Sequence, residues 1–347
     1  MNKVRARGES IRQFIFEQIG DHHHDIAAVT AEHFGISRQA VNKHLQRLVE
    51  EKALVAHGET KARRYALRPL DIWHKTYPIE SKLTEDGVWR SDIGPAFEHL
   101  PENIRDIWHY GFTEMFNNVI DHAQASSVTV HFKRTAMATE LMIIDDGMGI
   151  FRKIQDALGL LDERHAVLEL AKGKFTTDPF NHSGEGIFFT SRMFDRFDII
   201  SGDVYFTHHF EADEDWILEA GNVSGTQVWM KINNHTARNV KKVFDQYTAG
   251  DDFGFDKTVV PVRLAQYGDD KLVSRSQAKR LLARVDRFKV VILDFEGVET
   301  IGQAFADEVF RVFTHKHPQI DLVHIHTTDA VMRMIKRATA GGYPPEN

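Results

Sequence analysis

The 347-residue sequence contains no cysteine and no long uninterrupted hydrophobic run. The lack of cysteine excludes disulfide bonds and thiolate metal sites, and is typical of proteins from a reducing compartment. No apolar run approaches the ~18 residues of a membrane-spanning helix. The N-terminal stretch MNKVRARGESIRQF lacks the apolar segment of a secretory signal. The sequence therefore predicts a soluble, cytoplasmic protein with no membrane partner.

Charge is unevenly distributed along the chain. The net charge is −7, yet residues 1–70 carry 12 Lys and Arg against 8 Asp and Glu. The N-terminal segment is basic while the rest of the chain is acidic, which indicates that this segment binds an anionic partner.

Residues 1–70 show three helical patterns. Apolar spacing predicts helices over Ser10 to Ile19, Ile26 to Phe34 and Arg38 to Glu50, with Ser37 capping the third. Two short strand-like runs follow, Leu54 to Ala56 and Arg63 to Leu67, and predict a hairpin. This pattern resembles the winged helix-turn-helix of bacterial regulators.

That resemblance implies a double-stranded DNA partner. The third helix would place polar side chains in a major groove, and the hairpin would supply cations for phosphates. The candidate DNA-binding residues are Arg38, Gln39, Asn42, Lys43, Lys61, Arg63 and Arg64. The alternative is a winged helix that binds protein and never touches DNA.

A carboxylate and an amide share a helix face in the run FTEMFNNVIDH. Glu114 and Asn118 are four residues apart, so they lie one above the other on a helix. Glu114 can accept a proton from an attacking water, and Asn118 can offer its carbonyl oxygen to a Mg²⁺ held mainly by phosphates. The pair suits a polyphosphate site, although such a pair on a helix is often only a solvated face.

The run DDGMGI follows an apolar strand-like stretch. It supplies the carboxylate of Asp145 and then Gly147 and Gly149, which allow backbone to pass close to a flat ligand.

Together these runs resemble the boxes of the GHKL ATPase superfamily (gyrase, Hsp90, histidine-kinase and MutL type). Glu114 and Asn118 resemble its N box, and DDGMG resembles its D-x-G-x-G box. HSGEGI resembles the second glycine box, with Ser183, Gly184 and Gly186, and Thr226 resembles the late G-T element.

The resemblance implies a Bergerat-type α/β sandwich over residues 95–250 that binds ATP and Mg²⁺. Asp145 would accept a hydrogen bond from the adenine amino group, which guanine cannot offer. Glu114 would be catalytic and Asn118 the magnesium ligand. Gly184 and Gly186 would open a helix whose amides face the phosphates.

Other patterns complete the expected core. Strands are expected at Ser127 to Lys133 and Glu140 to Ile144, and a helix over Gly186 to Phe194. Four more short strands are expected over 198–201, 204–210, 216–220 and 226–232. Residues 151–181 occupy the position of the family's mobile ATP lid, in which Lys172 and Lys174 are candidate phosphate-binding cations.

Residues 71–94 are predicted to be a connector, and residues 256–340 a third unit. Strands at Val259 to Leu264, Val290 to Asp294 and Ile320 to Ile325 alternate with helices, which predicts a small α/β layer. The run VVILDFEGVETIGQAFADEVFRVF resembles STAS-like domains. Because Glu299 and Thr300 replace the usual phosphorylated serine motif, docking to a protein partner is favoured over a phosphoswitch.

The fold class expected is therefore multidomain α+β. The leading functional hypothesis is an ATP-binding transcriptional regulator in which ATP, and its hydrolysis by a GHKL ATPase, controls domain arrangement. Two alternatives stay open: a serine/threonine protein kinase of the anti-sigma type, and a nucleotide-gated scaffold without turnover. A homodimer is compatible with all three.

Overall fold

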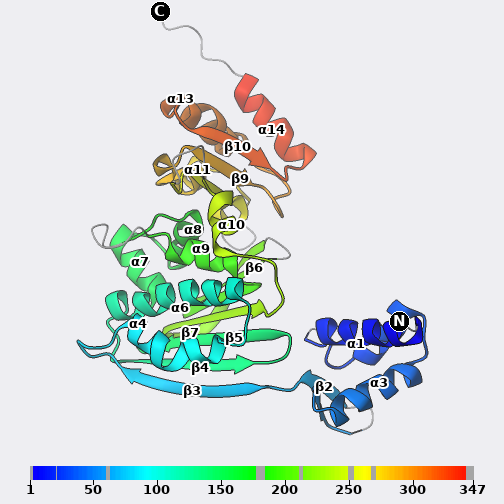
Figure 1. Cartoon of the computed structure of the whole chain (residues 1–347). Coiled ribbons are helices and arrows are strands. Elements are labelled where there is room, and N and C mark those ends of the chain that lie inside the picture. The colour runs from blue at the N-terminus through cyan, green and yellow to red at the C-terminus, as the bar shows by residue number, and fades with distance from the viewer. Residues whose placement is uncertain are drawn as a thin grey trace, which may run out of the picture. The chain divides into compact units, whose positions relative to one another are not determined.

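The computed structural model describes most of the chain. The described residues are 3–20, 22–59, 63–176, 184–210, 214–248, 254–266 and 271–340. They form two compact units, one of residues 1–75 with 130–141 and 231–236, and one of the remaining residues. Helices and strands alternate in several layers, which confirms the predicted multidomain α+β class (Figure 1).

The N-terminal residues form three helices and a hairpin. These elements are α1 (Lys3–Gln18), α2 (Ile26–Phe34), α3 (Arg38–Glu50), β1 (Leu54–His57) and β2 (Arg64–Leu67). The Ser37 hydroxyl accepts the backbone N–H of Ala40 at 3.2 Å and caps α3, as expected. Strands β1 and β2 pair antiparallel.

Burial of one face of α3 explains why this region folds. The buried side chains of Val41, Leu45 and Leu48 recur at helical spacing and join a core with Ile15 and Leu54. The opposite face of α3 is left to solvent.

The middle part of the sequence forms a five-stranded sheet, with the strand order β3-β4-β5-β7-β6. Its strands are β3 (Asp71–Pro78), β4 (Ser127–Arg134), β5 (Ala138–Asp145), β6 (Arg196–His209) and β7 (Glu214–Asn233). The expected four short strands after residue 197 are wrong, because they merge into the two long strands β6 and β7. Residues 71–78, assigned to a connector from sequence, form the edge strand β3.

Helices cover this sheet. They are α4 (Glu85–Val88), the π-helical turn η2 (Trp89–Ile93), α5 (Gly94–Phe97), α6 (Glu102–His122), α7 (Ile150–Leu158), α8 (Arg164–Lys172), α9 (Gly186–Met193) and α10 (Val240–Gln246). In Figure 1, α6 lies along the sheet, and α6 also packs against α9.

The longest of these helices, α6, is fixed by its apolar face. Ile104, Trp108, Phe112, Met115 and Phe116 are buried at spacings of three and four residues. The polar side chains between them are thereby held at a defined angle around the helix axis.

The C-terminal residues form a small α/β layer. Its elements are β8 (Lys257–Pro261), η3 (Val262–Ala265), α11 (Arg275–Leu282), η4 (Val285–Arg287), β9 (Val290–Asp294), α12 (Gln303–Asp307), η5 (Glu308–Phe313), α13 (Thr314–Lys316), β10 (Asp321–Ile325) and α14 (Asp329–Ala340). The strands are parallel, in the order β10-β9-β8. The strand expected to reach Leu264 is wrong at its end, since the chain turns into the 3₁₀ helix η3 at Val262.

No helix among the described residues is long and apolar enough to cross a membrane.

Candidate functional site

A cavity of about 250 Å³ opens where α6, β5, β7 and the start of α9 meet. All of its lining residues belong to one compact unit. The predicted site residues in its lining are Glu114, Asn118, Asp145, Gly149, Gly184, Gly186 and Thr226. Gly147 is outside the lining, and Ser183 lies outside the described residues. Residues up to 112 positions apart in sequence are thus brought to one cavity by the fold.

The α6 pair stands at the cavity wall. Glu114 and Asn118 are both half-buried, one helical turn apart. Gly186 lies so close to Glu114 that a Cβ there would collide with the Glu114 carboxylate. Gly186 therefore leaves room for the Glu114 carboxylate in its present position, which an added Cβ would displace.

Asp145 ends β5 and carries a buried charge. It is 4% exposed, and its Oδ1 accepts the backbone N–H groups of Gly147 at 2.8 Å and Thr226 at 3.2 Å. Burial raises the pKa of this carboxyl, while these hydrogen bonds act in the opposite direction. The carboxylate is thus oriented by neutral donors and retains acceptor capacity toward the cavity.

The glycines of the DDGMGI run approach protein backbone closely. A Cβ at Gly147 would collide with the Ala123 carbonyl, and Met148 N–H donates to that carbonyl at 3.0 Å. Gly149 has φ +88° and faces the Ser201 hydroxyl. Small residues here are therefore required for packing the loop as well as for space at a ligand.

The carboxylate of Asp146 anchors the same loop from outside. It accepts hydrogen bonds from the backbone and hydroxyl groups of Ser126 and Ser127. These bonds, led by the Ser126 hydroxyl, lower the pKa of Asp146 to about 2. Two adjacent aspartates thus have opposite environments, and only Asp145 lines the cavity.

Sequence reasoning missed Lys153. Among the lining residues that the structure describes, it is the only Lys or Arg. Its ammonium donates to the His122 carbonyl at 2.6 Å, and burial lowers its pKa against the opposing effect of Asp121. Its position one turn into the helix after the second glycine could have revealed it.

Phe175 was also missed. It lines the cavity, and its backbone N–H donates to the Gly184 carbonyl at 3.1 Å. An isolated phenylalanine carries no sequence signal that it lines a cavity. Tyr110, one turn before Glu114 on α6, is not among the lining residues; burial, followed by the charges of Glu114 and Glu185, raises the pKa of its phenol.

The two lysines suggested as phosphate-binding cations are placed elsewhere. Lys172 is 1% exposed and its ammonium is bound by Glu169 and two carbonyls, so the prediction for Lys172 is wrong. Lys174 donates to the Arg287 carbonyl at 3.2 Å and lies 3.9 Å from the Asp256 carboxylate. Neither lysine lines the cavity.

The donors at the cavity suit magnesium bound through phosphates. Within the described ranges, no group of three or more His, Asp or Glu side chains could hold a metal ion. Glu114 and Asn118 nevertheless offer hard oxygen donors side by side, and Mg²⁺ at polyphosphates commonly takes one or two protein oxygens. The residues therefore fit a cation that arrives with a nucleotide.

The candidate DNA-binding residues lie in the other compact unit. Arg38, Gln39, Asn42 and Lys43 are exposed on α3, opposite its buried face. Arg63 and Arg64 are exposed at the start of β2, and Arg63 lies over the Tyr65 ring. Lys61 lies outside the described residues. The DNA-binding role of all seven residues stays a prediction.

Comparison with protein families identifies two segments. Residues 91–205 match the histidine kinase-like ATPase domain, and residues 277–332 match a STAS-like domain of unknown function. No curated protein matches the chain. The chain thus contains a GHKL-type ATPase domain, which holds most of the cavity lining, and a STAS-like domain that supplies β9, α12, β10 and parts of α11 and α14.

Proposed function

We propose that this protein binds Mg-ATP in the cavity of its histidine kinase-like ATPase domain and hydrolyses it. One observation carries the proposal: Glu114, Asn118, Asp145, Gly186 and Thr226, which belong to four separate motifs, line a single cavity. If these motifs matched the family only by chance, their residues would have no reason to meet in one cavity. The matched domain, over residues 91–205, supports nucleotide binding independently.

Each residue then has a role that its position allows. The buried Asp145 carboxylate accepts a hydrogen bond from the adenine amino group. Guanine has a carbonyl at that position, and two acceptors cannot form a hydrogen bond. Asn118 supplies an oxygen to Mg²⁺, and Glu114 accepts a proton from the attacking water. The backbone amides at the start of α9, helped by the charge of Lys153, face the phosphates.

We further propose that the nucleotide state regulates binding of double-stranded DNA by the N-terminal helices. The support is the exposed polar face of α3 and the exposed Arg63 and Arg64 at the start of β2. ATP can shift this activity only through a different affinity for two arrangements of the chain. DNA binding should therefore differ between the ATP-bound, ADP-bound and nucleotide-free protein.

The test is to measure both activities on the same purified chain. ATP and GTP binding are followed by calorimetry, phosphate release by a coupled assay, and binding to genomic DNA fragments by gel shift with each nucleotide. ATP binding with a strong preference over GTP, slow phosphate release and nucleotide-dependent DNA binding are expected. Absence of ATP binding would overturn the proposal.

The remaining outcomes separate the alternatives. Radiolabel transferred from the γ-phosphate to protein would identify a kinase instead of an ATPase. Tight ATP binding without phosphate release would identify a nucleotide-gated scaffold. DNA binding that is equal in all nucleotide states would remove the regulatory part and leave the ATPase assignment intact.

A further inference from the structure

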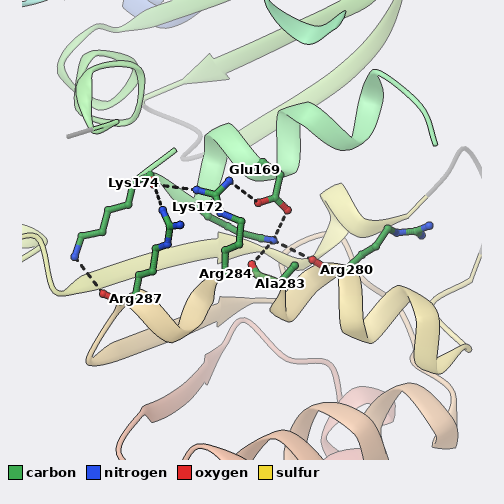
Figure 2. A network of polar contacts seen from close by, with 7 residues as sticks. All are labelled: Glu169, Lys172, Lys174, Arg280, Ala283, Arg284 and Arg287. Atoms are coloured by element: carbon green, nitrogen blue, oxygen red, sulfur yellow. Dashed lines mark hydrogen bonds and ion pairs between the residues drawn. The ribbon is translucent and has the colours of Figure 1, made fainter. Parts of the chain in front are cut away.

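The ATPase domain and the C-terminal domain share a buried ionic contact. Lys172, the last residue of α8, donates from its ammonium to Glu169 at 2.7 Å. It also donates to the carbonyls of Arg280 and Ala283, both at 2.9 Å, at the end of α11. Figure 2 shows the ammonium between these three acceptors. A fully bonded ammonium joins the two domains here.

The backbone just after Lys172 is bound by the C-terminal domain as well. The carbonyl of Lys174 accepts a hydrogen bond from Arg284 and another from Arg287, each at 2.9 Å. The Lys174 ammonium donates a hydrogen bond to the Arg287 carbonyl, as Figure 2 shows. We call residues 172–176 the lid stem, because they belong to residues 151–181, the position at which the family carries its ATP lid.

Arg284 reaches one residue further, to the cavity wall itself. Its guanidinium carbon lies 4.7 Å from the centre of the Phe175 ring, a cation–π distance, and 3.6 Å separates its Nη1 from Glu169. Phe175 and the neighbouring Thr176 line the cavity. Arg284 has φ +63°, an unfavourable conformation for a residue with a side chain, so the surrounding contacts hold it in place.

We propose that Arg284 is a positioning residue for the nucleotide site, through which the C-terminal domain holds the lid stem and raises nucleotide affinity. The inference rests on the proposed ATP binding. The path has two steps: Arg284 fixes the Lys174 carbonyl and the Phe175 ring, and Phe175 fixes Gly184, through their backbone hydrogen bond, at the cavity edge.

Coupling of this kind must work in both directions. If docking of the C-terminal domain on the lid stem raises ATP affinity, bound ATP must strengthen that docking by the same factor. A contact that merely holds two domains together would show no such reciprocity. This difference gives the test a readout that a structural role would not change.

The experiment uses the full chain and three substitutions. Arg284→Ala removes the hydrogen bond to Lys174, the contact with the Phe175 ring and the ion pair with Glu169. Arg287→Ala removes only a hydrogen bond from an exposed side chain. Arg333→Ala, at an exposed position of α14, is the matched control. ATP affinity is measured by calorimetry, and hydrogen exchange of α11 and of residues 172–176 is measured with and without ATP.

We expect Arg284→Ala to weaken ATP binding about tenfold, the scale of one charge-assisted hydrogen bond. Arg287→Ala should weaken it about threefold, and Arg333→Ala should leave it unchanged. ATP should slow exchange in α11 of the wild-type chain and fail to do so in Arg284→Ala. Circular dichroism and the exchange pattern of β4 and β5 verify that each variant is folded.

The outcomes are distinct from those for the proposed function. A wild-type chain that binds no ATP defeats the proposed function. A wild-type chain that binds ATP, with Arg284→Ala and Arg287→Ala binding equally well, overturns this inference alone. If Arg284→Ala does not fold, the graded loss in Arg287→Ala and the effect of ATP on exchange in α11 decide the question.

Discussion

Two buried charges in this protein have opposite surroundings. Lys172 is enclosed by a carboxylate and two carbonyls, so its charge is neutralised within the protein. Asp145 is nearly as buried, but its Oδ1 is held by neutral N–H groups, and it borders a cavity. A charge matched inside the fold joins two parts of the protein, whereas a charge kept at a cavity is available to a ligand.

The largest expected effect follows from breaking the matched charge. Lys172→Ala removes the donor of two carbonyls and leaves the buried Glu169 carboxylate with only the Arg284 guanidinium, 3.6 Å away. The free energy of unfolding should fall by about 3 kcal/mol, the low end of the range for breaking a buried ion pair. Denaturant unfolding measures this loss. Lys336→Ala, at an exposed position of α14, is the control and should change stability by less than ~0.5 kcal/mol. An equal loss in both variants would contradict the assignment.

Asp145→Asn should have the opposite profile, with binding lost and the fold retained. The amide oxygen can still accept from Gly147 and Thr226, but the amide nitrogen presents a donor to the adenine amino group, so ATP affinity should fall about 100-fold or more. Calorimetry measures this change. Asp106→Asn, at an exposed position of α6 outside the cavity lining, is the control and should keep ATP binding.

The stability of Asp145→Asn should also depend on pH in a defined direction. Burial raises the folded-state pKa of Asp145 above its ordinary value of 3.8, so its ionised form destabilises the fold as pH rises above that value. Relative to wild type, the variant should therefore gain stability as pH rises from below 3.8 towards neutrality. Well below pH 3.8 the wild-type carboxyl is protonated in both states, so the difference between the two proteins should no longer change with pH. If the stability of the variant relative to wild type were lower at pH 7 than at pH 4, the predicted direction of the pH dependence would be wrong.

Glu114→Gln should separate the chemical step from nucleotide binding at the same cavity. The amide fits beside Gly186 but cannot take a proton from water, so phosphate release should fall by about 100-fold or more while ATP affinity changes little. Single-turnover kinetics with labelled ATP measure the chemical step. Unchanged phosphate release would remove Glu114 as the base.

The smallest effect is expected where neither buried charge is touched. Arg38→Ala combined with Lys43→Ala removes two exposed cations of α3 and should weaken DNA binding by about tenfold and flatten its salt dependence. ATP affinity and unfolding should stay at wild-type values. DNA binding that is unchanged over a salt series would exclude α3 as the contact surface.

Much of the architecture was predictable because its signals are local. The apolar spacing of α3 and α6 marks their buried faces, and Ser37 caps α3 as its position suggests. The motifs around Glu114, Asp145 and Gly186 could be recognised for the same reason, since each is a short run. Strand ends were harder to place, because the long strands β6 and β7 continue through polar residues that only pairing within the sheet stabilises.

Local patterns in the sequence thus specified most element types, the two family-matched domains and seven of the residues that line the cavity, but not Lys153 or Phe175. Which charge serves which purpose depends on the tertiary structure. Lys172 and Lys153 are chemically identical lysines, yet Lys172 bonds to the C-terminal domain and Lys153 lines the cavity. No local pattern around Lys172 shows that its partners are distant carbonyls. The free energy of a charge depends on the partners and the burial that distant segments provide, and those exist only once the chain has folded.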